Sequence, residues 1–173
     1  AKVIDTDKIA HALAKPQQPL WEAYRQHFGA EILDENDCLC REKIAARVFS
    51  DPAEKRWIDG AAHPLIEAVV KKKIAALAKK GEKFVFLDVP LLFEAQWNRM
   101  VDRIWLVYVS KDRQIARLMK RNGYAQEEAA ARIRAQLPLA EKRQRADRVI
   151  ENDGTPKETR AQVKAAWEEL LST

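Results

Sequence analysis

The amino-acid sequence predicts an α/β protein built on a doubly wound parallel sheet. The chain has 173 residues, of which 47% are hydrophobic, and this is enough to bury one sizeable core. Four short segments are almost continuously apolar, which is typical of strands that are covered on both faces. Helical patterns separate these segments, and strands that alternate with helices indicate parallel pairing.

The expected strands are rich in valine, isoleucine and aromatic residues. They are Lys2–Asp5, Phe84–Asp88, Ile104–Val109 and Arg148–Asn152. The first helix follows the first strand directly: Thr6 or Asp7 is its expected cap, and it stops before Pro16. Pro19 opens a second helix that Gly29 ends. Further helices are expected at Arg41–Phe49, Pro52–Ala62, Pro64–Lys80, Asp112–Asn122, Ala125–Ala135 and Pro156–Leu171.

The spacing between the strands predicts two insertions. About 75 residues separate the first two strands and about 38 separate the last two, whereas a simple crossover needs a dozen or so plus its helix. A helical insertion is therefore expected near residues 16–80 and an arginine-rich helical pair near 113–147. The remaining segments, 1–15, 81–112 and 148–173, form the expected core.

The composition limits the classes of partner. The formal net charge is +5, and the densest basic stretch lies between Arg113 and Arg148, so nucleic acid, an acidic surface and a phosphorylated small molecule are all candidates. The five tryptophans are dispersed and no nucleic-acid module is recognisable, which favours the small molecule. No apolar run reaches the roughly 18 residues of a membrane span, and Cys38 and Cys40 are expected to be free thiols, so the cytoplasm is the expected compartment.

Several segments together resemble the dephospho-coenzyme A kinase family. Val3–Leu13 is similar to the family's VIDAD-x-IA-x-x-L segment. The other matching segments follow in the family's order: Phe49–Pro52, His63–Ile66, Asp88–Glu94, Gln114–Arg121, Ala135–Gln136 and Ala146–Gly154. The resemblance implies a P-loop kinase fold that transfers the γ-phosphoryl group of ATP, with Mg²⁺, to the 3′-hydroxyl of dephospho-coenzyme A. It also implies that 16–80 is a substrate-binding insertion and 113–147 a lid.

One family motif is missing from this sequence. None of its five glycines lies in a phosphate-binding loop of the form G-x-x-x-x-G-K-[ST]. The chain thus resembles the family from about 25 residues into its fold, and an upstream segment carrying the first strand and the loop is expected. A binding-only fragment that retains the substrate domain but cannot hold ATP is the corresponding alternative.

Acidic residues at strand ends are the candidate catalytic groups. Asp5 and Asp7 follow the first strand, at the sheet edge where open α/β sheets bind ligands. The resemblance implies that Asp7 is the base for the acceptor hydroxyl, with Asp5 supporting it, whereas helix capping is the alternative role of Asp7. Asp88 ends the second strand, where a carboxylate can bind Mg²⁺ directly or through water; a strand-end turn is its alternative role.

Arginines on one helix are the candidate ATP ligands. Arg113, Arg117 and Arg121 recur every four residues and so share one face. A solvated face is the usual meaning of such a stripe, but the resemblance implies that Arg117 and Arg121 bind phosphate. Arg117 is also a candidate catalytic residue, because a cation over the transferring phosphoryl group assists the transfer. It also implies ATP contacts from Arg143, Asn152 and Gly154.

The helical insertion and the turn after the second strand supply the candidate substrate contacts. Arg41 is expected to pair with a substrate phosphate, and His63 to line the pocket unless it is a capping or packing residue. The resemblance implies that Pro90, Leu91 and Leu92 face the pantetheine portion; Leu91 and Leu92 can equally be ordinary core. Another small-metabolite or nucleoside monophosphate kinase and a basic nucleic-acid-binding domain remain the alternative functions. The oligomeric state is not indicated.

Overall fold

The computed structural model describes residues 1–172, except for the side chain of Phe49. That side chain, part of one quoted motif, and Thr173 lie outside the described residues. The chain divides into two compact units, Ala1–Pro90 and Leu91–Thr173. The predicted division into core, insertion and lid stays a prediction.

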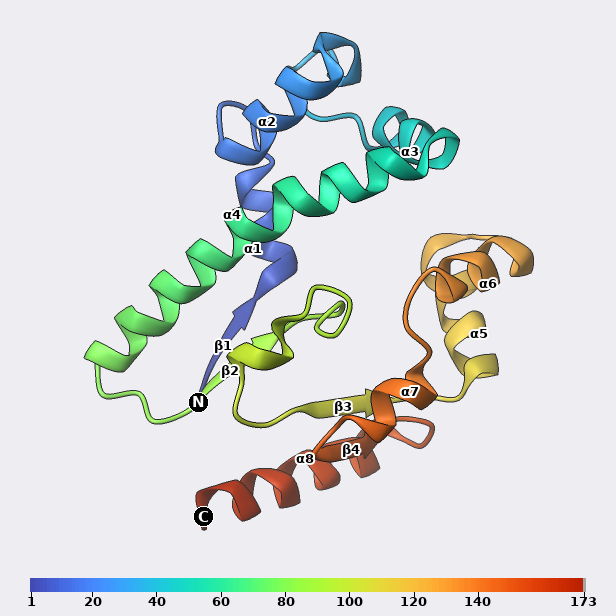
Figure 1. The fold of residues 1–173 in the computed structure, drawn as a ribbon. Helices are drawn as coiled ribbons and strands as arrows, with labels where there is room; N and C mark the ends of the chain where they lie inside the picture. The colour runs from blue at the N-terminus through green and yellow to red at the C-terminus, as the bar shows by residue number, and fades with distance from the viewer. Residues whose placement is uncertain (173) are drawn as a thin grey trace. The chain divides into compact units, whose positions relative to one another are not determined.

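The first unit combines a small parallel sheet with helices. Its elements are β1 Lys2–Asp5, α1 Thr6–Leu13, α2 Pro19–Phe28, the short 3₁₀ helix η1 Ala30–Ile32, α3 Arg41–Ser50, α4 Pro52–Lys79 and β2 Val85–Asp88. β1 and β2 lie side by side in Figure 1 and pair in parallel, with Lys2 opposite Val85 and Asp5 opposite Asp88. The parallel pairing predicted from the apolar segments is therefore present here.

The helices of the first unit share an aromatic core. Its buried residues are Leu20, Trp21, Tyr24, Phe28, Ile32 and Leu33. The Trp21 indole N–H donates to the Asp37 carbonyl oxygen at 2.6 Å, so the polar atom of this side chain is satisfied. His27 stacks on Trp57 with ring centroids 3.6 Å apart, which joins α2 to α4.

The second unit repeats the parallel pairing. Its elements are the short 3₁₀ helix η2 Trp97–Met100, β3 Trp105–Tyr108, α5 Lys111–Asn122, α6 Gln126–Arg134, α7 Leu139–Gln144, β4 Arg148–Glu151 and α8 Pro156–Leu171. β3 pairs with β4 from Trp105 opposite Arg148 to Tyr108 opposite Glu151. Each sheet has two strands among the described residues, and Val3 of β1 and Val107 of β3 are 67% and 54% exposed.

Two local predictions are wrong. The cap of α1 is Asp5, whose carboxylate accepts from the Lys8 N–H at 2.9 Å, rather than Thr6 or Asp7. The Thr6 hydroxyl instead donates to the Asp88 carbonyl oxygen at 2.8 Å.

The second error concerns α4. The helices expected at Pro52–Ala62 and Pro64–Lys80 form one helix of 28 residues, with Pro64 in its interior. Pro64 removes one backbone hydrogen bond from the helix. Its ring is exposed, so it does not prevent Ile66 and Val70 of the same helix from being buried. Tertiary packing thus overrides the local stop signal. The short helix α7 was not predicted at all.

Candidate active site

The carboxyl ends of β1 and β2 bring three aspartates to one edge of the first unit. Asp5 and Asp88 are opposite each other in the strand register, and Asp7 is the second residue of the helix that follows β1. Parallel strands end at the same edge, which is why residues so distant in sequence meet. We call Asp5, Asp7 and Asp88 the acidic edge.

Asp5 and Asp7 of the acidic edge differ in basicity. Burial raises the pKa of Asp7, and the negative charges of Asp5 and Asp88 raise it further. The pKa of Asp5 is lowered, chiefly because its carboxylate accepts from the backbone N–H of Lys8 and then from the Lys8 side chain. Asp5 is therefore held in its ionised form, whereas Asp7 is the better proton acceptor.

The role of Asp7 as a helix cap has no support in this geometry. Asp5 caps α1, and Asp7 lies inside the first turn of the helix. A carboxylate there interacts favourably with the helix dipole but does not need to hold a backbone N–H. Its side chain is consequently available for another partner.

Asp88 has the donor chemistry for a divalent cation. Its side chain is exposed, and carboxylate oxygen is the ligand type that Mg²⁺ prefers. The described residues contain no group of three or more His, Cys, Asp or Glu side chains that could hold a metal ion. Mg²⁺ in kinases commonly takes one or two carboxylates and completes its shell with water and phosphate oxygens, so Asp88 fits a nucleotide-borne Mg²⁺.

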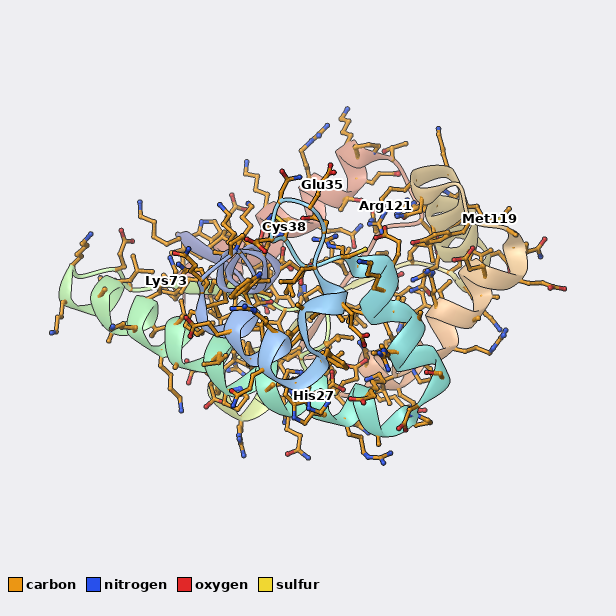
Figure 2. All side chains as sticks on the ribbon, turned by 90° about the horizontal axis from the view of Figure 1, so that it is seen from above. His27, Glu35, Cys38, Lys73, Met119 and Arg121 are labelled. Carbon is orange, nitrogen blue, oxygen red and sulfur yellow. The ribbon has the colours of Figure 1, made fainter. Side chains whose placement is uncertain are left out.

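The second unit contains an arginine-lined cavity of about 860 Å³. Its lining comes from the end of β3, from α5, from α6 and from the residues that connect and follow these helices: Val109, Gln114, Arg117, Leu118, Lys120, Arg121, Asn122, Tyr124, Arg132, Ile133 and Gln136. Both predicted phosphate ligands, Arg117 and Arg121, are among them, and Figure 2 shows Arg121 on α5. We call this space the arginine cavity.

The second unit also brings Arg117 together with the segment after β4. The Arg117 guanidinium donates to the backbone carbonyl oxygen of Asn152 at 2.7 Å. The Asn152 amide oxygen accepts from the Thr159 hydroxyl at 3.1 Å, so α8 fixes the orientation of this segment. Two of the predicted ATP contacts, 35 residues apart, are thus neighbours.

Arg143 and Gly154 occupy different surroundings. The Arg143 guanidinium forms an ion pair with Glu151 at 2.8 Å and lies 4.8 Å from the centre of the Tyr108 ring, and it is not among the described residues that line the arginine cavity. A Cβ at Gly154 would overlap with Oε2 of Glu158, which caps α8 together with Thr155. Glycine at 154 therefore leaves room for this capping carboxylate. ATP contact by either residue stays a prediction.

The predicted substrate contacts are spread over several elements. Arg41 begins α3, and its guanidinium lies 3.3 Å from the His11 imidazole of α1. His63 is partly buried within α4. Pro90 ends the first unit, while Leu91 and Leu92 begin the second, with Leu91 37% exposed. Their contact with a substrate stays a prediction.

Comparison with known proteins identifies the family. The family model described as dephospho-CoA kinase matches residues 1–158. The chain belongs to the dephospho-CoA kinase family. A dephospho-CoA kinase of Symbiobacterium thermophilum is 42% identical over 167 residues, which cover 96% of this chain and 70% of the relative. That of Geobacillus kaustophilus is 44% identical over 174 residues, covering 97% of this chain and 85% of the relative.

Solved structures confirm the predicted α/β fold class. A Thermus thermophilus crystal structure matches with a TM-score of 0.79 and 32% identity over 98% of this chain and 84% of that one. A dephospho-CoA kinase from Campylobacter jejuni matches with a TM-score of 0.69 and 25% identity, again over 98% and 84%. The described part of the chain has no helix long and apolar enough to cross a membrane.

This dephospho-CoA kinase family member also has cavity residues that were not predicted. Lys120 and Tyr124 line the arginine cavity. The Arg132 guanidinium lies 4.2 Å from the centre of the Tyr124 ring and binds Glu128 at 2.9 Å. The ion pair between Glu128 and Arg132 could have been predicted from their i,i+4 spacing on a helix. Contact with Tyr124 depends on how α5 and α6 fold back, which no local pattern specifies.

Proposed function

We propose that this protein transfers the γ-phosphoryl group of ATP to the 3′-hydroxyl of dephospho-coenzyme A, giving coenzyme A and ADP. Family membership supports the substrates, and the acidic edge supports the chemistry. The observation that carries the proposal is Asp7, a carboxylate made more basic by burial and by two neighbouring carboxylates, at the ligand-binding edge of a parallel sheet.

Asp7 acts as the general base. The 3′-hydroxyl donates its hydrogen bond to the Asp7 carboxylate, and the proton moves to Asp7 as the ribose oxygen attacks the γ-phosphorus. The bond between the γ-phosphorus and the bridging oxygen of ADP breaks, and ADP leaves with that electron pair. Asp5, ionised and anchored to Lys8, keeps the local potential negative and thereby keeps Asp7 basic.

Asp88 is the proposed protein ligand of Mg²⁺. When bound, Mg²⁺ neutralises phosphate charge that develops during the transfer. Asp88 supplies one carboxylate at the end of β2, and its main chain is fixed by the hydrogen bond from Thr6. Nucleotide oxygens and water would supply the other ligands of a bound Mg²⁺.

The arginine cavity is the proposed site for ATP phosphates. Arg117 and Arg121 each present a planar guanidinium to one cavity, a geometry that suits phosphate oxygens. Asn152 and Gly154 lie on the segment to which Arg117 is bonded, which supports a nearby contact with the nucleotide base. Arg143 reaches ATP in this proposal after release from Glu151.

The remaining predicted residues form the proposed acceptor site. Arg41 pairs with a phosphate of dephospho-coenzyme A, and His63 lines the same space. Pro90, Leu91 and Leu92 line the pantetheine portion. Residues 16–80 are accordingly proposed as the substrate-binding insertion and 113–147 as the lid, on a core of 1–15, 81–112 and 148–173. The proposed compartment is the cytoplasm, and no nucleic acid or membrane takes part.

An acceptor panel tests the proposed function. The protein expressed from its complete reading frame is incubated with ATP, Mg²⁺ and dephospho-coenzyme A, pantetheine, adenosine or a nucleoside monophosphate, and ADP release is followed. Dephospho-coenzyme A is expected to give the largest kcat/KM by at least tenfold. A larger value for a nucleoside monophosphate assigns the chain to that alternative class instead. Binding of dephospho-coenzyme A without turnover by that protein supports the binding-only alternative.

A further inference from the structure

An ion pair with one buried partner lies in the second unit, outside the groups that the proposed mechanism uses. Nζ of Lys142, on α7, lies 2.8 Å from Oε1 of Glu94, and the Lys142 side chain is only 6% exposed. The same oxygen of Glu94 accepts from the backbone N–H of Leu137 at 2.9 Å. One carboxylate oxygen therefore holds both the segment before α7 and the helix itself.

Glu94 is well suited to this role because its own segment is fixed. It lies in a turn after Leu91, where the Ala95 N–H donates to the Leu91 carbonyl at 2.9 Å and the Trp97 N–H to the Leu92 carbonyl at 2.8 Å. Trp97 is 3% exposed and anchors the end of the turn. These hydrogen bonds and the buried Trp97 side chain thus fix the conformation of the turn.

The charge state of Glu94 agrees with the contacts. Burial acts to raise the pKa of Glu94, but the hydrogen bonds from Lys142 and from backbone N–H groups outweigh it and hold the pKa below its ordinary value. The carboxylate is ionised at neutral pH and pairs with the ammonium group.

A second contact joins the same two segments. The Arg145 guanidinium, just after α7, lies 5.6 Å from the centre of the Phe93 ring. Phe93 and Glu94 are adjacent in the turn, so two neighbouring side chains hold the stretch from Leu137 to Arg145. This stretch is the return segment of the arginine-rich helices, because it leads from α6 back to β4.

The opposite end of the arginine-rich helices is fixed as well. Ser110, which precedes α5, donates its backbone N–H to the Asp153 carboxylate at 3.1 Å. The α5–α6 pair is therefore tethered at its start by Asp153 and at its end by Glu94. Apart from Val109, all residues that line the arginine cavity lie between Ser110 and Leu137 in the sequence.

We propose that Glu94 and Lys142 are a positioning pair that fixes the return segment on the turn carrying Leu91 and Leu92, and so holds Arg117 and Arg121 in register for phosphoryl transfer. The inference rests on the proposed function of the arginine cavity. Neither residue touches the reacting atoms. The Glu94–Lys142 ion pair sets the fraction of molecules in which α5 and α6 are correctly placed when a substrate occupies the turn.

The test uses a double variant that removes the charges together. Glu94→Leu with Lys142→Met removes both charges of the pair, whereas truncation of Glu94 alone would leave the buried Lys142 ammonium without this carboxylate. The matched control is Glu168→Leu with Lys164→Met, because those residues form an exposed ion pair on α8 at 3.7 Å. Both proteins are expressed from the complete reading frame and compared with wild type.

Two readouts are taken together. Hydrogen exchange in residues 135–145 is expected to accelerate at least tenfold in the double variant, with α8 unchanged. The kcat for ADP release is expected to fall about tenfold, while the KM for the acceptor stays within threefold. The control is expected to match wild type in both measurements.

The other outcomes overturn the inference. Faster exchange with wild-type kcat means that the pair is only structural, and a lower kcat with unchanged exchange means that it acts in some other way. If the double variant does not fold, Glu94→Gln is used, because this change removes the charge but keeps an oxygen that can accept from the Leu137 N–H. Wild-type kcat and wild-type exchange in Glu94→Gln also overturn the inference. The kcat is measured with the best acceptor of the panel, so rejection of dephospho-coenzyme A overturns only the proposed function.

Discussion

Asp7 combines a proposed catalytic role with a cost to stability. Its carboxylate is surrounded by Asp5 and Asp88 and is partly removed from water, and both effects oppose ionisation. A group tuned in this way is common at active sites, because the same environment that makes a carboxylate basic disfavours its charged form in the folded state.

The first prediction concerns turnover. Asp7→Asn keeps the size of the side chain but removes the proton acceptor, so kcat is expected to fall at least 100-fold with little change in the KM for dephospho-coenzyme A. Steady-state kinetics on the protein from its complete reading frame provide the measurement. Asp102→Asn, a change of the same charge outside the site, is the control. Retained activity would remove Asp7 from the mechanism.

The second prediction concerns pH and stability. The folded pKa of Asp7 lies above the ordinary value of 3.8, so protonation of Asp7 stabilises the folded state. This stabilisation is complete below pH 3.8 and is lost as the pH rises through the folded pKa. Asp7→Asn is therefore expected to raise Tm at pH 7, and the difference is expected to shrink toward pH 3.

Asp5 provides the opposite case. Its folded pKa is lowered, so the ionised carboxylate of Asp5 stabilises the folded state. This stabilisation is present above pH 3.8 and is lost as the pH falls through the folded pKa. Asp5→Ala also removes the cap of α1 and is expected to lower Tm at pH 7 by roughly 2–4 °C. Thermal unfolding of both variants from pH 3 to 8 gives the comparison. Equal shifts of the same sign would contradict the assignment of the two carboxylates.

At the scale of elements, α4 differs from its local signals at one position. Pro64 lies in the helix interior and is exposed, so it removes a hydrogen bond without adding much packing. Pro52 lies in the first turn, where a proline costs little because its N–H would have no partner within the helix.

These two prolines provide the third prediction. Pro64→Ala is expected to raise the free energy of unfolding by up to about 3 kcal/mol, because the new N–H can complete the helix. Pro52→Ala is the matched control and is expected to change it by less than about 0.5 kcal/mol. Urea denaturation followed by circular dichroism measures both. A loss of stability in Pro64→Ala would mean that the proline ring has a packing role.

The sequence predicted helix ends most accurately where the residues that start and stop a helix agree with the tertiary packing. Pro19 and Gly29 bound α2 as expected, since proline fits the first turn and Gly29 takes a φ of 82°. Asp5, Thr6 and Asp7 are three consecutive good caps, so sequence alone did not specify which one caps α1. The approach of Arg117 to Asn152 could not be predicted without the fold, because the contact joins the middle of α5 to the residue that follows β4, 35 residues later.

At the scale of the whole molecule, the proposed phosphate-binding arginines and the proposed acceptor residue Arg41 lie in different units. The acidic edge and Arg41 lie in Ala1–Pro90, and the arginine cavity lies in Leu91–Thr173. A chain divided in this way can respond to each substrate locally, because binding stabilises the part of the structure that makes the contacts.

The fourth prediction follows from this division. Dephospho-coenzyme A alone is expected to slow hydrogen exchange chiefly in residues 41–64, and ATP with Mg²⁺ chiefly in 109–136, because each ligand stabilises the segments that it contacts. Mass spectrometry of peptides from the protein with each ligand gives the measurement. Protection by ATP confined to Ala1–Pro90 would contradict the proposed role of the arginine cavity.

The small sheets have a consequence for how residues 1–173 behave in concentrated solution. Each described sheet has two strands, so each strand has one bonded side and one side that no described strand covers. Val3 and Val107 add exposed apolar surface to two of these strands. Open, apolar strand edges are templates for pairing between molecules, while a net charge of +5 opposes close approach. Added salt screens that repulsion, so colloidal association of this chain is expected to increase with both ionic strength and protein concentration.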